Sequence, residues 1–396
     1  MMNKYSGEIW NDNYRGPGEE TVENTWKRLA TEAAKPEKKE NRKTVSEEFY
    51  SILQDFKFIP GGRIMANIGV KGRESTTLMN CFVHNPVDIN YRDPDSIEGI
   101  YTMLKAQAHT LKSEGGYGTN FSYIRPAGTY VNGIGSRTPG VLKFMELWDK
   151  SSEIITMGSE KILGELKEDE KIKIRKGAQM GVLSVWHPEI EDFIIAKQTS
   201  GRLTKFNLSV GITHGFMQAV EKDKDWHLIF PDTTHPKYEQ KWKGDIDDWK
   251  ARGYEVIIYK TVKARDLWDS ISYATYTRNE PGVFFLDLFN KLNPLVGKEQ
   301  ILATNPCGEI GMATGVCNLG SLNLTKFIKK ETEKLVFDFK EYTRCIKIAG
   351  RFLDNINDIS NAPLQEYKDS MTIKRRIGLG NMGLGSLLIM FGIRYG

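Results

Sequence analysis

The amino-acid sequence predicts an α/β fold that follows a helical N-terminal region. Amphipathic helical patterns dominate residues 1–75. Beyond them, short β-rich runs alternate with helical patterns, which is typical of parallel sheets covered by helices. Glycine clusters such as GGYG at 115–118 fall between these elements, where loops of α/β folds commonly carry the function. We therefore predict a helical region over residues 1–75 and an α/β region over residues 76–396.

The helical region contains two patterns. Val22, Trp26 and Leu29 recur at the spacing of one helix face, so we expect a helix over residues 20–34. Thr44 and Glu47 have the spacing of a capping box, which predicts that a second helix begins there. We expect this second helix to end before the PGG segment at 60–62.

The α/β region shows its alternation element by element. We expect strands at residues 78–83, 119–124, 180–185, 205–210 and 254–259. We expect helices near residues 97–112, 141–155, 190–196, 264–277, 339–359 and 382–390. The almost wholly charged residues 165–176 are expected to form an exposed loop, and the glycine-rich residues 301–324 to be mostly irregular.

Composition excludes several classes of protein. The 55 basic residues nearly balance the 51 acidic ones, which argues against a nucleic-acid partner. No signal peptide occurs, and no apolar run approaches the ~20 residues of a membrane span, so we expect a cytoplasmic protein with no membrane partner. Cysteines stay reduced there by default. Neither a CxxC pair nor a ligand-like histidine spacing occurs, so we expect no metal site.

The segment NPCGE at 305–309 carries the clearest chemistry. Asn305, Cys307 and Glu309 occupy alternate positions, so an extended backbone would project all three to one side. Pro306 and Gly308 favour an unusual loop over a strand or helix. A thiol beside a hydrogen-bond donor and a possible base is a catalytic arrangement. The alternative is a small buried cysteine without reactivity.

Residues 305–309 and 315–321 (GVCNLGS) resemble the active-site loop of the ribonucleotide reductase large chain, and are most similar to its adenosylcobalamin-dependent class. Further segments resemble the family in the same order: 60–64, 78–83, 95–97, 121–128, 177–183, 206–210 and 378–380. The resemblance implies that the α/β region is part of a ten-stranded α/β barrel, with its active-site loop near 301–324.

The family's residue roles carry over to matching positions. The resemblance implies that a thiyl radical on Cys307 abstracts the 3′ hydrogen of a ribonucleotide, and that Cys81 and Cys317 deliver electrons and end as a disulfide. It implies that Glu309 acts as base on the 3′ hydroxyl and that Asn305 hydrogen-bonds the substrate, with Asn80 as a further substrate-binding residue. Cys345 matches no motif and is expected in the core.

The resemblance also implies ligands and partners. These are a ribonucleoside di- or triphosphate substrate, a thioredoxin-type reductant, a second copy in a homodimer, and either adenosylcobalamin or a radical from a separate metal subunit. A deoxynucleotide or ATP effector would bind at Asp95, Ser96, Ile97 and Arg125. Asp95 and Ser96 have an equally weighted structural explanation as the N-cap of the next helix. A charged insertion at 162–173 departs from the family beside the second specificity loop.

Several alternatives stay open. Family members continue well beyond residues 378–380, so we expect a fragment or one part of a split enzyme that needs a complementary C-terminal chain. A catalytically silent nucleotide-binding or dimerisation module and a plain thiol-disulfide protein are the rival functions. The GLGNMG segment at 378–383 matches a dinucleotide pattern without the acidic residue that it requires. Asp225 and His227 nearly form a cobalamin signature, but Phe230 stands where it needs glycine.

Overall fold

The structure is a computed structural model, and it describes residues 3–86, 93–131, 135–163, 177–332 and 334–396. The charged loop expected at 165–176 and most of the 162–173 insertion lie outside these residues. The chain divides into two compact units. The first contains Met1–Asn80 and Val316–Gly396, and the second contains Cys81–Gly315.

The first unit joins the N-terminal helices to the last part of the chain. Strand β13 (Gly315–Asn323) pairs antiparallel with β1 (Phe58–Pro60) and parallel with β16 (Ile377–Met382). The remaining described elements are helices α1 (Lys4–Asn13), α2 (Val22–Ala33), α3 (Arg42–Leu53), α4 (Gly62–Asn67), α13 (Phe339–Ile359), α14 (Gln365–Ile373) and α15 (Leu384–Phe391), 3-10 turns η1 (Gln54–Phe56) and η4 (Leu324–Phe327), and the hairpin β14–β15 (Ile328–Glu331 and Lys334–Phe337).

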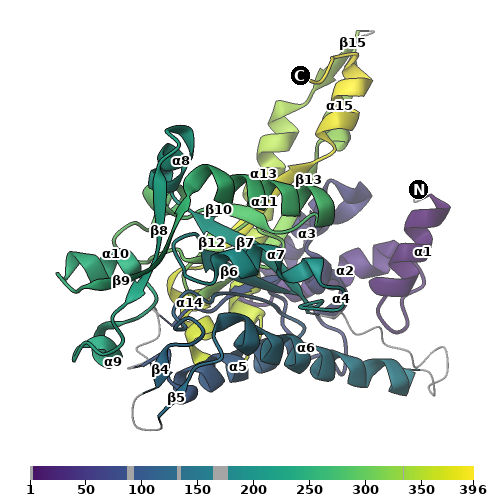
Figure 1. The fold of residues 1–396 in the computed structure, drawn as a ribbon. Helices are drawn as coiled ribbons and strands as arrows, with labels where there is room; N and C mark the ends of the chain where they lie inside the picture. Colours follow the sequence, from purple (N-terminus) through teal and green to yellow (C-terminus); the bar gives the residue numbers. More distant parts are fainter. Residues whose placement is uncertain (1–2, 87–92, 132–134, 164–176, 333) are drawn as a thin grey trace. The chain divides into compact units, whose positions relative to one another are not determined.

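The second unit is built on a parallel sheet. Its strand order is β2 (Cys81–Val83), β3 (Gly116–Asn120), β6 (Gln179–Ser184), β7 (Phe206–Ile212) and β10 (Gly282–Phe285). Every residue of β3 and β6 is buried, as expected for central strands that are covered on both faces. Figure 1 shows α5 (Ile97–Lys112) and α6 (Val141–Leu163) side by side, and these two helices connect β2 to β3 and β3 to β6.

Hairpins and shorter helices complete the second unit. The hairpins are β4–β5 (Tyr130–Val131 and Ser136–Arg137), β8–β9 (Asp225–Pro231 and Val256–Lys263) and β11–β12 (Ala303–Thr304 and Gly311–Met312). The helices are α7 (Ile190–Ile195), η3 (Ala196–Gln198), α8 (His214–Glu221), α9 (Tyr238–Lys241), α10 (Ile246–Ala251), α11 (Ala264–Arg278) and α12 (Leu286–Leu292). Among the residues that the structure places, no helix has the length and apolar character needed to cross a bilayer.

Most of the predicted helices and strands are present, but the strand predicted at 119–124 corresponds to β3 at Gly116–Asn120 and the strand predicted at 254–259 to β9 at Val256–Lys263. The helices predicted at 97–112 and 339–359 have the predicted bounds. The capping box is wrong, because α3 begins at Arg42 and contains Thr44 and Glu47 in its interior. The prediction of irregular backbone is wrong for β13, where neighbouring strands supply the hydrogen bonds that glycine-rich sequence alone does not predict. Pairing partners are properties of the fold and leave little trace in a short segment.

Candidate active-site loop

The loop that contains the NPCGE segment is closed by the short hairpin β11–β12. Ala303 pairs with Met312 and Thr304 pairs with Gly311. At the tip, Gly308 adopts φ +82°, a left-handed conformation that glycine adopts without strain. The backbone therefore turns at 306–309, so the predicted loop is confirmed and the extended alternation of residues 305, 307 and 309 is wrong.

Asn305 organises this turn. Its Oδ1 accepts a hydrogen bond from the Ile310 amide at 3.0 Å, and its backbone oxygen accepts one from the Gly308 amide, also at 3.0 Å. The side chain is 1% exposed. Because the carboxamide oxygen is used within the loop, its Nδ2 group is directed to other partners. Asn305 is thus a structural residue of the loop as well as a candidate for substrate binding.

Three predicted site residues meet at the Asn305 carboxamide. Asn305 Nδ2 donates to Glu309 Oε2 at 2.6 Å and to Cys81 Sγ at 3.1 Å. The Cys81 thiol donates to Glu309 Oε1 at 3.5 Å. Cys81 belongs to β2, more than two hundred residues earlier in the chain, and is buried. The fold therefore brings a carboxamide and a carboxylate of the loop together with the thiol of Cys81, whereas the sequence pattern had placed the Cys307 thiol beside them.

Cys307 differs from the other cysteines in exposure. It lies at the turn and is exposed, whereas Cys81, Cys317 and Cys345 are buried. Cys345 lies in α13, where burial and the neighbouring Glu341 carboxylate raise the pKa of its thiol to about 11. Its expected place in the core is confirmed. The Cys307 side chain is therefore accessible to solvent in this chain, and the other three thiols are not.

Neighbouring strands hold the loop through residues that the sequence did not single out. Gly118 of β3 lies so close to the loop that a Cβ atom there would stand 1.9 Å from the Thr304 carbonyl oxygen. Asn120 Nδ2 donates to the Leu302 carbonyl at 2.8 Å, and Asn207 Nδ2 donates to the Pro306 carbonyl at 2.7 Å. Asn207 therefore fixes the backbone directly before Cys307. The only sign of Asn207 in the sequence was its place in the family-like segment 206–210.

Cys317 and Asn80 belong to the first unit. Cys317 lies in β13, and its Sγ is 3.2 Å from the Asn318 carbonyl oxygen. The Asn80 amide donates to the Cys317 carbonyl at 3.1 Å, so these two predicted residues are neighbours within the unit. The Asn80 Oδ1 atom is buried and accepts no hydrogen bond from any described residue.

The predicted effector residues surround a cavity of about 340 Å³ in the second unit. Asp95 is buried beneath it and forms an ion pair with Arg125, whose backbone amide also donates to Asp95 at 2.8 Å. Tyr238 donates its hydroxyl to Asp95 at 2.6 Å and lies under the Arg125 guanidinium at 5.4 Å. Burial raises the pKa of Asp95 to about 6, although Arg125 and Tyr238 both oppose this shift. No sequence motif indicated that Tyr238 would contact this site.

Ser96 and Ile97 have different surroundings. Ser96 Oγ accepts a hydrogen bond from the Gly99 amide at 3.0 Å, so the N-cap explanation is confirmed for this residue. Ile97 is 64% exposed beside the cavity. The part of the second specificity loop at 175–176 lies outside the described residues. The four residues thus share one cavity, while Asp95 and Ser96 are already engaged in contacts within the protein.

The backbone does not have the expected loop conformation at either the dinucleotide-like segment 378–383 or the cobalamin-like segment 225–230. Gly378 and Gly380 lie inside strand β16 and not in a turn between a strand and a helix. His227 lies in the β8–β9 hairpin, where its Nδ1 is 2.9 Å from the Thr261 hydroxyl. Phe230 is fully buried among aromatic side chains. Neither segment forms the loop that its pattern would require.

These features define an α/β protein whose cysteine-bearing loop is held against the strands of a parallel sheet. Two family models match the chain, described as "Ribonucleotide reductase, barrel domain" over residues 79–396 and "Ribonucleotide reductase, all-alpha domain" over residues 3–73. The chain belongs to the family of ribonucleotide reductase large chains. This confirms the resemblance and the predicted fold class, whereas the division at residues 75 and 76 stays a prediction.

Individual relatives agree with the family. A vitamin B12-dependent ribonucleoside-diphosphate reductase from Mycobacterium tuberculosis is 33% identical over 88% of this chain and 44% of its own length. One with the same name from Thermoplasma acidophilum is 32% identical over 88% of this chain and 39% of its own length. A ribonucleoside-diphosphate reductase subunit alpha from Chlamydia trachomatis is 27% identical over 95% of this chain and 34% of its own length. The chain thus spans less than half the length of these curated relatives.

Proposed function

We propose that this chain carries the catalytic loop of a ribonucleotide reductase, which reduces ribonucleoside di- or triphosphates to 2′-deoxyribonucleotides for DNA synthesis. The observation that carries the proposal is the cluster of Cys81, Asn305 and Glu309 beside the exposed Cys307. Removal of a hydroxyl from an unactivated sugar carbon is beyond ordinary acid–base catalysis. A thiol that takes part in radical chemistry, a base and a reducing thiol are the groups that such a reaction needs.

Each residue has a role in this proposal. A thiyl radical on Cys307 removes the 3′ hydrogen of the substrate, while Glu309 accepts the proton of the 3′ hydroxyl and Asn305 holds the sugar by hydrogen bonds. The 2′ hydroxyl leaves as water, and after the reduction Glu309 returns the proton to the 3′ oxygen and Cys307 returns the hydrogen to the 3′ carbon, which regenerates the thiyl radical. Cys81 and Cys317 together give up two electrons and two protons and become a disulfide, which a thioredoxin-type reductant then reduces. Asn80, with its buried and unused Oδ1, is a further substrate contact.

The radical source is proposed to be adenosylcobalamin, because two of the relatives named above are vitamin B12-dependent. When bound, this cofactor would supply the radical that Cys307 takes up. The exposure of Cys307 suits a source that approaches from outside the loop. The Asp225–His227 pattern does not fit a cobalamin site, because it lies in a paired hairpin, so no described residue is assigned to hold the corrin. A separate metal subunit is the alternative source.

The proposal extends to regulation and partners. A deoxynucleotide or ATP effector would occupy the cavity at Asp95, Ser96, Ile97 and Arg125. We further propose a homodimer, a complementary C-terminal chain that completes the barrel, and a cytoplasmic location.

The test is deoxynucleotide formation by the full chain together with the C-terminal part of a relative, adenosylcobalamin and a dithiol. Product should form and should be lost in Cys307→Ser, whereas Cys345→Ser should retain it. A disulfide that joins Cys81 to Cys317 should appear by mass spectrometry after turnover without reductant. Activity only with a metal subunit would remove the cobalamin assignment, and nucleotide binding without any turnover would favour the silent module.

A further inference from the structure

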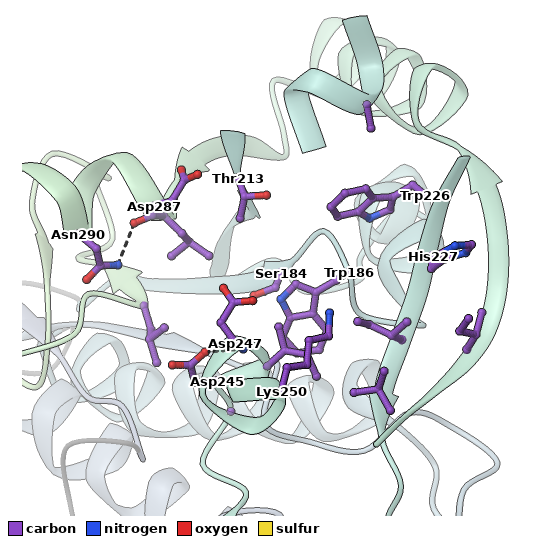
Figure 2. Close-up of a pocket in the computed structure, with 18 of the residues that line it drawn as sticks. Ser184, Trp186, Thr213, Trp226, His227, Asp245, Asp247, Lys250, Asp287 and Asn290 are labelled. Atoms are coloured by element: carbon purple, nitrogen blue, oxygen red, sulfur yellow. Dashed lines mark hydrogen bonds between the residues drawn. The ribbon is translucent and has the colours of Figure 1, made fainter. Parts of the chain in front are cut away.

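A second cavity, of about 780 Å³, opens at the carboxyl ends of neighbouring parallel strands in the second unit (Figure 2). Ser184 ends β6, Thr213 directly follows β7, and Leu286 directly follows β10, and all three line the cavity. Ligands of α/β folds bind preferentially at this edge of a sheet. Residues 305–309 are not among the described residues that line it. We call this space the carboxyl-end cavity, and it is separate from the proposed catalytic residues.

Negative charge predominates among its lining residues. The described lining contains the carboxylates Asp245, Asp247 and Asp287 and one lysine, Lys250, and a fourth carboxylate, Asp225, pairs with Lys263 at 2.8 Å. Backbone amides hold two of these groups in place. Asp245 accepts from the Asp247 amide at 2.9 Å, and Asp287 accepts from the His214 amide at 2.6 Å. The carboxylates are therefore positioned by the fold before any ligand arrives.

Asp247 lines the cavity as a solvent-exposed carboxylate. Among the described residues, no hydrogen bond reaches its carboxylate oxygens, and partial desolvation together with the charges of Asp245 and Asp287 raises its pKa. The positive charge of Lys250 lowers the pKa of Asp247 and so partly offsets this shift. Figure 2 shows that Asp247 and Lys250 both extend from α10 toward the cavity. A cation beside Asp247 would offset the repulsion between these carboxylates.

Two tryptophan side chains, Trp226 and Trp186, line separate parts of the cavity. Trp226 projects from β8 toward the cavity (Figure 2), and it is fixed by a hydrogen bond from its Nε1 to the Val185 carbonyl at 3.1 Å. Trp186 packs against Trp242, with ring centroids 6.3 Å apart. Aliphatic side chains complete the lining: Ile229, Ile246, Val256, Ile258 and Leu302. The faces of indole rings attract organic cations. An indole that is already held in place loses little conformational entropy when a ligand binds.

We propose that the carboxyl-end cavity binds a small organic cation, with its ammonium or guanidinium-type group at Asp247 and its apolar body against Trp226. The inference goes beyond the proposed reductase function and does not depend on it. A metal ion is a poorer occupant, because no group of three or more His, Cys, Asp or Glu side chains among the described residues is arranged to hold one. The mixture of an apolar wall and few fixed carboxylates suits an organic ligand.

The experiment is isothermal titration calorimetry on the full chain with benzamidine, its neutral isostere benzamide, and agmatine. Benzamidine and agmatine should bind, and benzamidine should bind at least about tenfold more tightly than benzamide. Asp247→Asn should weaken benzamidine binding about tenfold, because it removes the charge but no hydrogen bond within the fold. Lys250→Gln should strengthen it. Asp269→Asn, an exposed carboxylate on α11 that does not line the cavity, should leave it unchanged.

Several outcomes would overturn the proposal. These are equal affinity for benzamidine and benzamide, no binding of either cation at millimolar concentration, and unchanged affinity in both Asp247→Asn and Lys250→Gln. Displacement of benzamidine by magnesium chloride at matched ionic strength would replace the organic cation with a metal ion. Lys250 is exposed, so its variant tests the charge argument even if Asp247→Asn does not fold.

Discussion

Two clusters of polar residues in the second unit differ in the exposure of their surroundings. In the Asp95 cluster, the carboxylate is surrounded by Arg125 and Tyr238, so its charge is neutralised within the protein. In the loop cluster, Asn305 and Glu309 are bonded to each other, but the adjacent Cys307 is exposed. The first arrangement joins its charged and polar groups to one another, and the second lies beside a solvent-exposed thiol. The difference indicates that a short motif can identify candidate residues, whereas side chains from distant parts of the chain determine which of these residues are buried.

The exposure of Cys307 predicts a large difference in alkylation rate between this thiol and Cys81. Alkylation of the folded chain by iodoacetamide should modify Cys307 faster than Cys81 by on the order of a hundredfold, because Cys81 reacts only after local opening. Peptide mapping by mass spectrometry over time measures both rates. In urea the two rates should converge. Equal alkylation rates of Cys307 and Cys81 in the folded chain would show that the two thiols do not differ in solvent access.

The Asp95 cluster should respond to charge removal with a loss of stability. Asp95→Ala leaves the partly buried Arg125 guanidinium without its carboxylate, and we expect unfolding free energy to fall by about 3–5 kcal/mol. Denaturant unfolding measures the change, with the exposed Asp269→Ala as the control that should change little. Tyr238→Phe removes one hydrogen bond to the same carboxylate and should cost about 1.5–3 kcal/mol. A loss in Asp95→Ala no larger than in the control would refute the interpretation.

These two clusters also show how far sequence reasoning extends. Helix bounds such as those of α5 and α13 could be predicted, because amphipathic periodicity and caps are local. Asn305, Cys307 and Glu309 could be singled out because they share one short motif. Tyr238 could not, because it reaches Asp95 from 143 residues away. The loop-anchoring Asn207 lay in a family-like segment, but nothing local indicated that its amide would reach the Pro306 carbonyl.

A buried histidine should make the second unit sensitive to acid. His187 is fully buried, its Nδ1 accepts from the Glu189 amide at 3.1 Å, and burial lowers its pKa to about 4. Since the unfolded chain binds this proton near pH 6.5, stability present at neutral pH should be lost as pH falls from about 6.5 to about 4, by on the order of 3 kcal/mol. His187→Gln should flatten the pH dependence of denaturant unfolding. An unchanged slope in that variant would count against His187 as a cause.

The hydrogen bond between Asn207 and the Pro306 carbonyl should make a small contribution to stability, and its loss should change the mobility of the loop tip. Asn207→Asp keeps the size of the side chain but removes the donor to the Pro306 carbonyl, so we expect a loss of about 1 kcal/mol. Amide hydrogen exchange should become faster at residues 307–310. Asn120→Ala, which removes the contact to Leu302, should instead affect residues 303–305. If both variants change the same amides, the loop moves as one rigid piece. If only Asn207→Asp speeds amide exchange at the tip, β7 holds the backbone beside Cys307 independently of the β11–β12 stem. The position of the Cys307 thiol then depends on a strand that the NPCGE motif does not include.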